Sequence, residues 1–328
     1  MKHAFVTGGS GFVGSRLVKL LVSQGWQVHA LARSADSVMA VRNLGATPVA
    51  GDLNDVAALR TGMEGCDVIY HVAAHFKLWG PRRMFDRANI EGTRVLVEAA
   101  VAAPTVRRLI SVSAAAVVMG APEPMNSVTE TLPLQTPAFA PYATSKAIAE
   151  QILLEANGRR PGFETLAIRP PFIWGQGMPT LDHMIETVKA GRFQWVAGGK
   201  QAMSTCHVDN LCEALLLAAE RGRGGQAYFV SDGRDGTLKS VISALLETRG
   251  VYPKDRSVPF GMAWYMAGLM AAAWRGLSLK GEPPITRQML RLIGKDFTIA
   301  IDKARRELGY SPVITWADGL ARMRSAQT

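Results

Sequence analysis

The sequence has few cysteines and no long run of purely apolar residues. Its three cysteines, Cys66, Cys206 and Cys212, form no CxxC pair among 328 residues, which argues against a disulfide framework and a zinc site. We therefore predict no metal site. The chain enters an apolar run at residue 4 without the features of a secretory leader, so we expect a cytoplasmic protein. An uncharged stretch at 259–274 is too short to predict a membrane span.

Acidic residues are also in the minority. The chain has 37 Lys and Arg against 27 Asp and Glu, a net charge of +10. The basic residues are scattered rather than clustered, which favours solubility and attraction for an anionic cofactor. We expect no nucleic-acid partner. Peripheral contact with anionic lipid stays the second interpretation of this charge.

Glycines, by contrast, are concentrated where the chain begins its first turn. The apolar residues 4–6 predict a strand, and the apolar spacing of 15–22 predicts a helix, with a GxxGxxG pattern between them. Gly8 can adopt backbone angles closed to other residues, Gly11 leaves room for a diphosphate, and Gly14 allows close packing of helix on strand. The helix N-terminus would attract the phosphates. The predicted dinucleotide contacts are Gly8, Ser10, Gly11, Phe12, Val13 and Gly14.

The end of the second predicted strand, 27–31, bears on the choice of cofactor. An acidic residue there would bind the ribose hydroxyls of NAD and repel the 2′-phosphate of NADP. This chain has Ala32, followed by Arg33 and Ser34, and a guanidinium and a hydroxyl suit a phosphate. We therefore predict a preference for NADP(H), with NAD(H) as the alternative.

A third strand is predicted at 47–51, followed by a polar turn. Asp52 and Leu53 follow it directly, where a doubly wound fold would bring them to the adenine of a dinucleotide. An equally weighted alternative makes Asp52 the N-cap of a helix that starts near Val56.

The next segments keep alternating between strand and helix. Residues 67–74 predict a fourth strand that ends in the small residues Ala73 and Ala74, which would let a cofactor approach closely. Helical spacing follows at 94–103 and a fifth strand at 109–113. The alternation predicts an α/β fold with a parallel, doubly wound sheet that binds ligands at the carboxyl ends of its strands.

A second chemical centre is predicted at the start of a helix over 142–157. Tyr142 and Lys146 are four residues apart, so they share one face of that helix. A phenol normally loses its proton near pH 10, and a neighbouring ammonium lowers that pKa. The pair therefore predicts a general acid/base for an alcohol or a ketone.

With both centres in view, the chain resembles the extended short-chain dehydrogenase/reductase family. Within that family it is most similar to the 3β-hydroxysteroid and sterol dehydrogenase branch. The resemblance covers residues 1 to about 235 and more loosely the rest. The matching segments are Thr-Gly-Gly-Ser-Gly-Phe-Val-Gly at 7–14, His-Val-Ala-Ala at 71–74, Asn-Ile-Glu-Gly-Thr at 89–93, Pro-Tyr-Ala-Thr-Ser-Lys at 141–146, Arg-Pro-Pro-Phe-Ile-Trp-Gly at 169–175 and His-Val-Asp at 207–209.

The resemblance implies hydride transfer between a nicotinamide and a carbinol carbon. Tyr142 would exchange a proton with the substrate oxygen, and Lys146 would hold the nicotinamide ribose and lower the pKa of the phenol. Pro170 would lie against the cofactor. A serine after the fifth strand would bind the substrate oxygen. The usual serine pair is interrupted here, so we expect Ser113 in that role, with Ala114 or Ala115 as alternative alignments.

The expected substrate is a bulky apolar molecule. Phe172 stands where related sugar-nucleotide epimerases commonly have an asparagine, although it could also simply pack. We predict that His75 and Trp79 join Phe172 in the substrate site. The uncharged stretch 259–274 predicts a helix that covers this pocket, with a membrane-surface helix as the rival interpretation.

The expected molecule has a dinucleotide-binding domain at 1–175 and mainly a substrate lobe at 176–328, with parts near 205–235 returning to the first domain. We expect an NAD(P)-dependent oxidoreductase that interconverts a secondary alcohol and a ketone. A sugar-nucleotide epimerase or dehydratase and a non-catalytic NADP sensor remain alternatives. The resemblance also suggests a homodimer.

Overall fold

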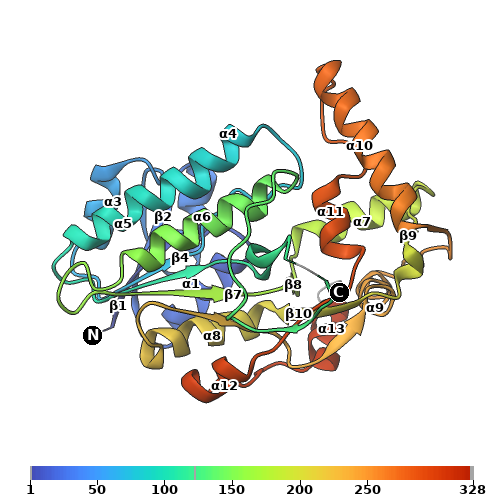
Figure 1. Ribbon diagram of the computed structural model, residues 1–328. Helices are drawn as coiled ribbons and strands as arrows, with labels where there is room; N and C mark the ends of the chain where they lie inside the picture. The colour runs from blue at the N-terminus through green and yellow to red at the C-terminus, as the bar shows by residue number, and fades with distance from the viewer. Residues whose placement is uncertain (1, 122, 326–328) are drawn as a thin grey trace.

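A seven-stranded parallel sheet forms the centre of the computed structural model, which describes residues 2–121 and 123–325 (Figure 1). The strand order is β3-β2-β1-β4-β5-β7-β11, so the chain winds outward in both directions from β1. This confirms the predicted doubly wound α/β fold. The strands are β1 His3–Thr7, β2 Gln27–Ala32, β3 Thr47–Ala50, β4 Val68–His71, β5 Arg108–Val112, β7 Glu164–Arg169 and β11 Gln226–Phe229.

Alternating apolar residues in each strand build one core on each face of this sheet. In β1, Ala4 and Val6 pack toward one face and Phe5 toward the other, as the period of two in a strand requires. The first face is covered by α1 Phe12–Ser23, α2 Ala35–Asn43, α8 Val208–Arg221 and α12 Asp302–Leu308. The second is covered by α3 Val56–Met63, α5 Gly92–Ala102 and α6 Pro141–Glu155 (Figure 1).

A second, five-stranded sheet lies beyond the carboxyl ends of the large sheet. Its order is β12-β10-β14-β6, with β8 paired to β10. Trp174 and Trp195 are fully buried in the core next to it. The strands are β6 Met125–Val128, β8 Phe172–Trp174, β10 Ala202–His207, β12 Asp235–Thr237 and β14 Phe297–Ile299, and the neighbouring helices are α7 Pro179–Lys189, α9 Leu238–Glu247 and α13 Trp316–Ser325.

One helix stands out from the rest of the molecule. It is α10, Phe260–Gly276, which projects away from both sheets (Figure 1). Its inner side packs against α11, Arg287–Ile293, and against the short pair formed by β9 Trp195–Val196 and β13 Ser257–Val258. No helix in the described part of the chain is long and apolar enough to cross a bilayer.

Four shorter helical segments complete the described part of the chain. Residues Arg82–Phe85 form α4, which runs into a π-helical segment at Asp86–Glu91 before α5. The 3₁₀ turns lie at Ala115–Val118 and Ala197–Gly199. The division at residue 175 into two functional lobes stays a prediction, although β11 and α8, which fall within 205–235, pack with the large sheet.

Candidate active site

The glycine turn between β1 and α1 has no space for larger residues at two of its three glycines, Gly8 and Gly14. Gly8 has a φ of +74°, and a Cβ there would lie 2.7 Å from the backbone nitrogen of Ala73. A Cβ on Gly14 would lie 2.0 Å from the Gly8 carbonyl oxygen. Gly11 is the N-cap of α1, and a Cβ on it would meet only that same oxygen, at 3.3 Å. Close packing therefore explains why positions 8 and 14 are glycine. Gly11 instead leaves the approach to the N-terminus of α1 open.

The N-terminus of α1 fits an anionic cofactor. The N-cap glycine has no side chain with which to bond the first N–H groups of the helix, and no acidic residue lies in the first turn. Such an end attracts phosphate through its free donors and its partial positive charge. Ser10, Phe12 and Val13 lie in the same turn, and Ala73 and Ala74 end the neighbouring β4 region.

A cavity of about 420 Å³ opens beside this turn. It is bounded by Ser10, Gly11 and Phe12 on one side and by Gln176 and Gly177 on the other. The cavity extends along the outer side of α1 toward Lys19 and does not include Tyr142. It therefore borders the expected diphosphate position but is separate from the proposed reaction centre.

Arg33 and Ser34 follow β2, as the cofactor argument requires. Both are exposed. Ser34 is the N-cap of α2: its hydroxyl accepts from the Ser37 N–H, and the Ser37 hydroxyl accepts from the Ser34 N–H. This capping role gives Ser34 a structural explanation, while Arg33 directly precedes the N-cap of α2 in the sequence.

Asp52 does not cap the next helix, so that alternative is wrong. The N-cap of α3 is Asp55, whose carboxylate accepts from the N–H of Ala58 at 3.0 Å. Asp52 instead accepts from the N–H of Asn54 at 2.8 Å and remains half-exposed in the turn. Leu53 packs toward α5, where a Cβ on Gly92 would lie 3.0 Å from its Cδ1.

Tyr142 lies in the first turn of α6, and Lys146 lies one turn later. Both are buried. The Lys146 Nζ donates to the Val112 carbonyl at the end of β5, at 2.7 Å. Burial lowers the pKa of Lys146 to about 8, and the Glu150 carboxylate acts in the opposite direction.

The net shift of the phenol's pKa in this structure is upward, opposite to the expected direction, and a lowering contribution from Lys146 stays a prediction. Burial raises the pKa of Tyr142 above its usual value. A desolvated phenolate lacks the water that would stabilise its charge. The Tyr142 hydroxyl is therefore protonated at neutral pH.

A buried network fixes the backbone of this tyrosine. The Ser145 hydroxyl donates to the Tyr142 carbonyl at 2.8 Å and accepts from the Asn89 side chain at 2.9 Å. The Asn89 Oδ1 accepts from the His75 N–H at 2.7 Å. From the other side, Gln288 of α11 accepts from the Tyr142 N–H at 2.9 Å. Sequence reasoning missed Asn89 and Gln288 as positioning residues; the motif at 89–93 was the available signal for the first.

A second buried chain joins the glycine turn to this network. The Thr7 hydroxyl is 2.8 Å from Nδ1 of His71, and Nε2 of His71 is 3.0 Å from the Thr93 hydroxyl. Thr93 donates in turn to the Asn89 carbonyl at 2.6 Å. Burial, with a smaller effect of Lys146, lowers the pKa of His71 to about 3, so the imidazole is neutral.

Ser113 is buried just after β5. Its Oγ has no hydrogen-bond partner among the residues that the structure describes. The serine role thus stays a prediction for Ser113, with Ala114 or Ala115 as the alternative alignments.

The ring that contacts Tyr142 directly is one that the sequence did not indicate. Phe76 meets the Tyr142 ring edge-on, with 5.0 Å between centroids, and is 52% exposed. His75 packs on Phe85 at 5.0 Å, and Trp79 lies under the guanidinium of Arg275 at 5.2 Å. The contact of Phe76 therefore places the segment 75–79 beside Tyr142.

Phe172 and Pro170 lie further along the same edge of the large sheet. Phe172 is half-buried in β8 and packs against the same core as Phe12. Pro170 is buried, and its carbonyl accepts from the Ala115 N–H at 2.8 Å. The structure therefore gives Phe172 a packing role in the core that Phe12 of the glycine turn also contacts, and joins Pro170 to the turn after β5.

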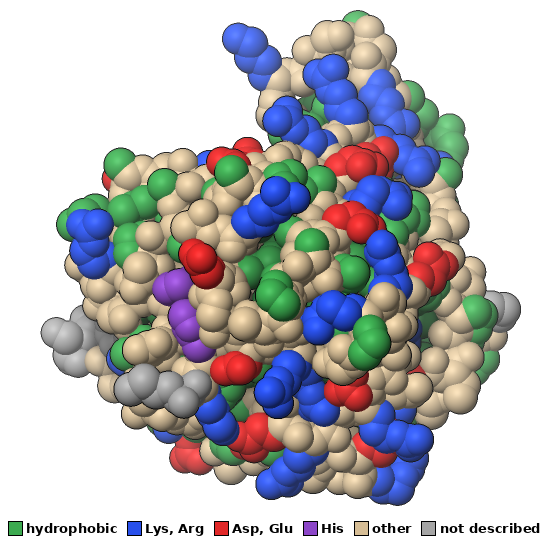
Figure 2. Space-filling model, turned by 90° about the vertical axis from the view of Figure 1, so that its left-hand side faces the viewer, with side chains coloured by type: hydrophobic (Ala, Val, Ile, Leu, Met, Phe, Trp, Pro, Cys, Tyr) green, Lys and Arg blue, Asp and Glu red, His purple; other side chains and the backbone are tan. Residues whose placement is uncertain are grey.

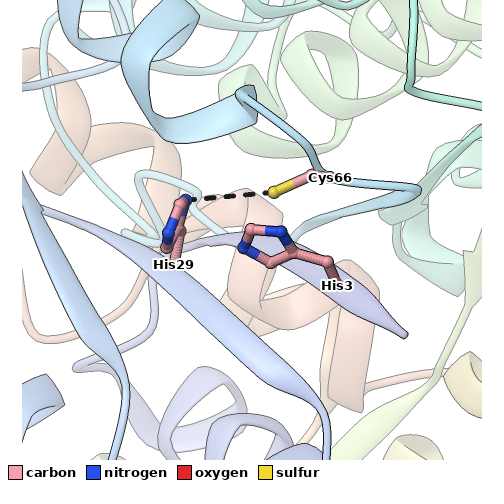
Figure 3. A group of neighbouring side chains, drawn as sticks. All are labelled: His3, His29 and Cys66. Atoms are coloured by element: carbon pink, nitrogen blue, oxygen red, sulfur yellow. Dashed lines mark hydrogen bonds between the residues drawn. The ribbon is translucent and has the colours of Figure 1, made fainter. Parts of the chain in front are cut away.

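One group of potential metal ligands lies elsewhere. His3, His29 and Cys66 approach one another at the amino ends of β1 and β2, with ligand atoms within 4.8 Å (Figure 3). His29 Nδ1 lies 2.9 Å from the Gly62 carbonyl at the end of α3, and the Cys66 thiol donates to the same oxygen at 3.3 Å. Hydrogen bonding to a helix end thus accounts for two of the three side chains, and no metal site is assigned.

The doubly wound sheet, the glycine turn on its first strand and the buried Tyr-x-x-x-Lys helix together define a dinucleotide-dependent oxidoreductase of the extended short-chain dehydrogenase type. Comparison with known proteins identifies the family within this class. Residues 5–260 match the model of the 3-beta hydroxysteroid dehydrogenase/isomerase family, and the chain belongs to that family.

Its relatives by sequence are reductases and dehydrogenases. The chain is 43% identical to the 4-hydroxy-2-methyl-3-oxo-4-farnesyl-3,4-dihydroquinoline-1-oxide ketoreductase of Stigmatella aurantiaca, over 99% of this chain and 96% of the relative. It is 33% identical to the 2-alkyl-3-oxoalkanoate reductase of Stenotrophomonas maltophilia, over 98% of each chain. The protein is thus an enzyme of the oxidoreductase class, and the non-catalytic alternative is set aside.

Solved structures support the fold. The crystal structure of gox2253 has a TM-score of 0.79 and 29% identity, with 99% of each chain covered. A dTDP-glucose 4,6-dehydratase from Streptomyces venezuelae, solved with NAD, has a TM-score of 0.75 and 24% identity, with 98% of this chain and 95% of that chain covered. Similarity to the sugar-nucleotide enzyme at this identity concerns the fold alone.

Proposed function

We propose that this protein uses a nicotinamide cofactor to reduce a ketone on a bulky apolar molecule to the secondary alcohol. The support for this direction is the burial of Tyr142, which raises the pKa of its phenol. A group that holds its proton at neutral pH is suited to donate it to a carbonyl oxygen. The same group would act as a base for alcohol oxidation only at higher pH.

The proposed roles follow from the contacts around Tyr142. A bound nicotinamide would supply the hydride. Tyr142 donates the proton to the substrate oxygen, while Asn89 and Ser145 hold its backbone in place through bonds of 2.9 and 2.8 Å. The Lys146 ammonium holds the ribose and adds positive charge beside the phenol. Ser113, whose Oγ is otherwise unpartnered among the described residues, binds the substrate oxygen.

For the cofactor, we propose NADP(H) over NAD(H). The support is the exposed Arg33 beside the N-terminus of α2, without an acidic residue at the end of β2. A guanidinium binds phosphate through paired, charge-assisted hydrogen bonds. The remaining proposed contacts are those predicted from the sequence, including Asp52 and Leu53 for the adenine and Pro170 against the cofactor.

For the substrate, we propose a ketone that bears a long alkyl or prenyl chain. The Stigmatella aurantiaca and Stenotrophomonas maltophilia relatives carry a farnesyl and an alkyl group in the names of their substrates. In this chain, Phe76 contacts Tyr142 and Trp79 lies nearby on the same segment. Together with Phe172 and His75, they would form an apolar lining next to the reacting carbon.

The test is a panel of ketones with each reduced cofactor. Purified protein is assayed with 2-alkyl-3-oxoalkanoates, ketosteroids, prenylated quinolone ketones and NDP-sugars, and oxidation of NADPH or NADH is followed at 340 nm. We expect turnover of apolar ketones, with NADPH preferred. Turnover of NDP-sugars alone, with NAD retained through purification, would instead support the epimerase or dehydratase alternative.

Variants then separate the proposed roles. Tyr142→Phe removes the hydroxyl and keeps the ring, so we expect kcat to fall at least about a hundredfold with the cofactor Kd unchanged. Ser113→Ala should lower kcat by about tenfold to a hundredfold if its hydroxyl binds the oxygen. A Ser113→Ala enzyme with the parental kcat would remove Ser113 from the mechanism.

Quaternary state and location are proposals as well. We propose a homodimer, on the family resemblance alone, and light scattering of the purified protein would decide. We propose a cytoplasmic enzyme that touches a membrane surface through the exposed residues of α10.

A further inference from the structure

The exposed apolar side chains are concentrated on one helix and the turn that follows it. Twelve large apolar residues of the described chain are markedly exposed, and six of them fall within residues 262–279. They are Met262 at 59%, Tyr265 at 66%, Met266 at 41%, Leu269 at 50%, Leu277 at 71% and Leu279 at 44%. A cluster of this kind on a soluble surface usually marks a site of interaction.

The solvent-facing side of α10 is apolar, whereas that of an ordinary surface helix is polar. Within α10, all of whose residues are described, only Ala263 and Ala267 are buried, and they pack toward Leu290 of α11. Met262, Met266 and Leu269 lie at spacings of four and three, so they form one stripe on the outer side. Phe260 and Trp264 are half-buried against the same inner cluster, but the outer stripe presents large apolar side chains to solvent, where a globular protein would place polar residues.

Basic side chains surround the end of this helix. Arg275 and Lys280 are exposed at its C-terminal end. Arg82 and Arg83, also exposed, lie on the segment that Arg275 joins through its contact with Trp79. Figure 2 shows Lys and Arg side chains gathered around the part that projects at the top of the molecule, with hydrophobic side chains beside them. Two acidic residues lie among these basic groups: Glu282 pairs with Lys77 at 3.2 Å, and Asp86 pairs with Arg82 at 3.4 Å.

The exposed stripe also lies near the reaction centre. Arg275 stacks on Trp79, and Phe76 of the same segment contacts Tyr142. Gln288 of α11 links Tyr142 to the segment 75–79, because it accepts from the Tyr142 N–H and donates to the Lys77 carbonyl at 3.3 Å. A partner that covers α10 would therefore sit beside the segment that covers Tyr142.

We propose that α10 docks this enzyme on the surface of an anionic lipid bilayer, with the stripe of Met262, Met266 and Leu269 in the interface and the basic residues against the headgroups. A helix that is apolar on its outer side and flanked by cations suits this position. The charge argues against a second copy as the partner, since two such ends would repel each other. Docking does not depend on the proposed reaction. If the proposed reaction is correct, an apolar ketone dissolved in the bilayer would meet the docked enzyme beside its active site.

The test is co-sedimentation of the full-length protein with vesicles. Vesicles of phosphatidylcholine with 30% phosphatidylglycerol, about a third anionic lipid, are compared with vesicles of pure phosphatidylcholine. We expect the protein to sediment with the anionic vesicles and at least about tenfold less with the neutral ones, and to dissociate in high salt. Absence of sedimentation with either, or equal sedimentation with both in high salt, would overturn the proposal.

Two variants and one control sharpen the test. Met266→Ser/Leu269→Ser should weaken binding to anionic vesicles by about tenfold or more, because both side chains leave the interface. Arg275→Glu/Lys280→Glu should reduce binding to the level of neutral vesicles. Tyr252→Ser is the matched control, since Tyr252 is 71% exposed but lies outside α10, and its binding should equal that of the parent.

Further measurements distinguish the other outcomes. Substitutions at these exposed positions should leave the melting temperature within about 2 °C of the parent. A variant that no longer binds vesicles but keeps this melting temperature has lost docking and not its fold. A dimer that dissociates in Met266→Ser/Leu269→Ser, without vesicle binding by the parent, would show that a second copy covers α10 and would refute the proposal. Reduction of a short, water-soluble ketone should be equal in parent and variants, so loss of docking and failure of the proposed reaction are read separately.

Discussion

Gly11→Ala separates binding of a dinucleotide from folding of the glycine turn. A Cβ on Gly11 would meet only the Gly8 carbonyl oxygen, at 3.3 Å, so the turn can accept it after a shift of a few tenths of an ångström. Because alanine is a poorer N-cap than glycine, we expect a loss of about 1 kcal/mol in the free energy of unfolding. For a chain of this size that corresponds to a drop of about 2 °C in Tm.

The effect on the cofactor should be much larger. The added methyl occupies the approach to the first N–H groups of α1, and loss of two charge-assisted hydrogen bonds costs about 3 to 6 kcal/mol. The Kd for NADPH, measured by calorimetry or by fluorescence of the bound cofactor, should rise at least a hundredfold, since about 1.4 kcal/mol corresponds to a factor of ten.

Gly14→Ala is the contrasting variant. Its Cβ would lie 2.0 Å from the Gly8 carbonyl oxygen, so the backbone must move by more than about 1 Å and stability itself should fall by about 3 kcal/mol or more. If Gly11→Ala binds NADPH within threefold of the parent while remaining folded, the diphosphate does not lie on this turn and the cofactor site has been misplaced.

Three further predictions concern charge. With saturating NADPH, kcat/KM for ketone reduction should halve near pH 8, the pKa of the buried Lys146, and fall to about a tenth one unit higher; a rate still rising there would exclude a role for its ammonium. His71 has a pKa of about 3 when folded against 6.5 unfolded, so the unfolded chain takes up the extra proton between these values. The contribution of neutral His71 to the free energy of unfolding is therefore fully present above pH 6.5 and is lost as the pH falls, by about 2 kcal/mol between pH 7 and 5. Denaturant titrations at several pH values should show that the free energy of unfolding depends less steeply on pH in His71→Asn. Arg33→Ala should raise the KM for NADPH by about tenfold or more and leave that for NADH within twofold, and equal effects on both would refute phosphate recognition by Arg33.

The parts of the fold that depend on local pattern were predictable. The glycine turn, the alternation of strands with helices and the Tyr142 helix each have signals within a short stretch of chain. The predicted strand at 27–31 is β2, Gln27–Ala32, and the predicted helix at 142–157 is α6, Pro141–Glu155. Periodicity and glycine spacing act over a few residues, so they survive without knowledge of tertiary contacts.

The predictions that failed depend on contacts distant in sequence. Burial of Tyr142 involves Phe76 and Gln288, which lie 66 and 146 residues away along the chain, and it reverses the expected shift of the phenol's pKa. The N-cap of α3 is Asp55, three residues after the Asp52 that the sequence analysis considered, and helix ends are hard to place from sequence. The stretch 259–274 was correctly predicted as a helix, but nothing in its uniform composition indicated which side would face solvent.

The reversal at Tyr142 ties the direction of the reaction to the architecture around it. Burial raises the pKa of Tyr142; Phe76 contacts its ring, and Gln288 of α11 accepts from its backbone N–H at 2.9 Å. Anything that lifts α11 would hydrate the phenol and bring its pKa back toward 10. Gln288→Ala should therefore raise the rate of alcohol oxidation at high pH relative to ketone reduction, whereas Gln288→Glu, which keeps the acceptor oxygen for the Tyr142 N–H, should preserve the parental ratio better. The ratio of the two rates across pH, measured for both variants, tests this coupling, and equal ratios in parent and Gln288→Ala would show that exclusion of water does not depend on α11.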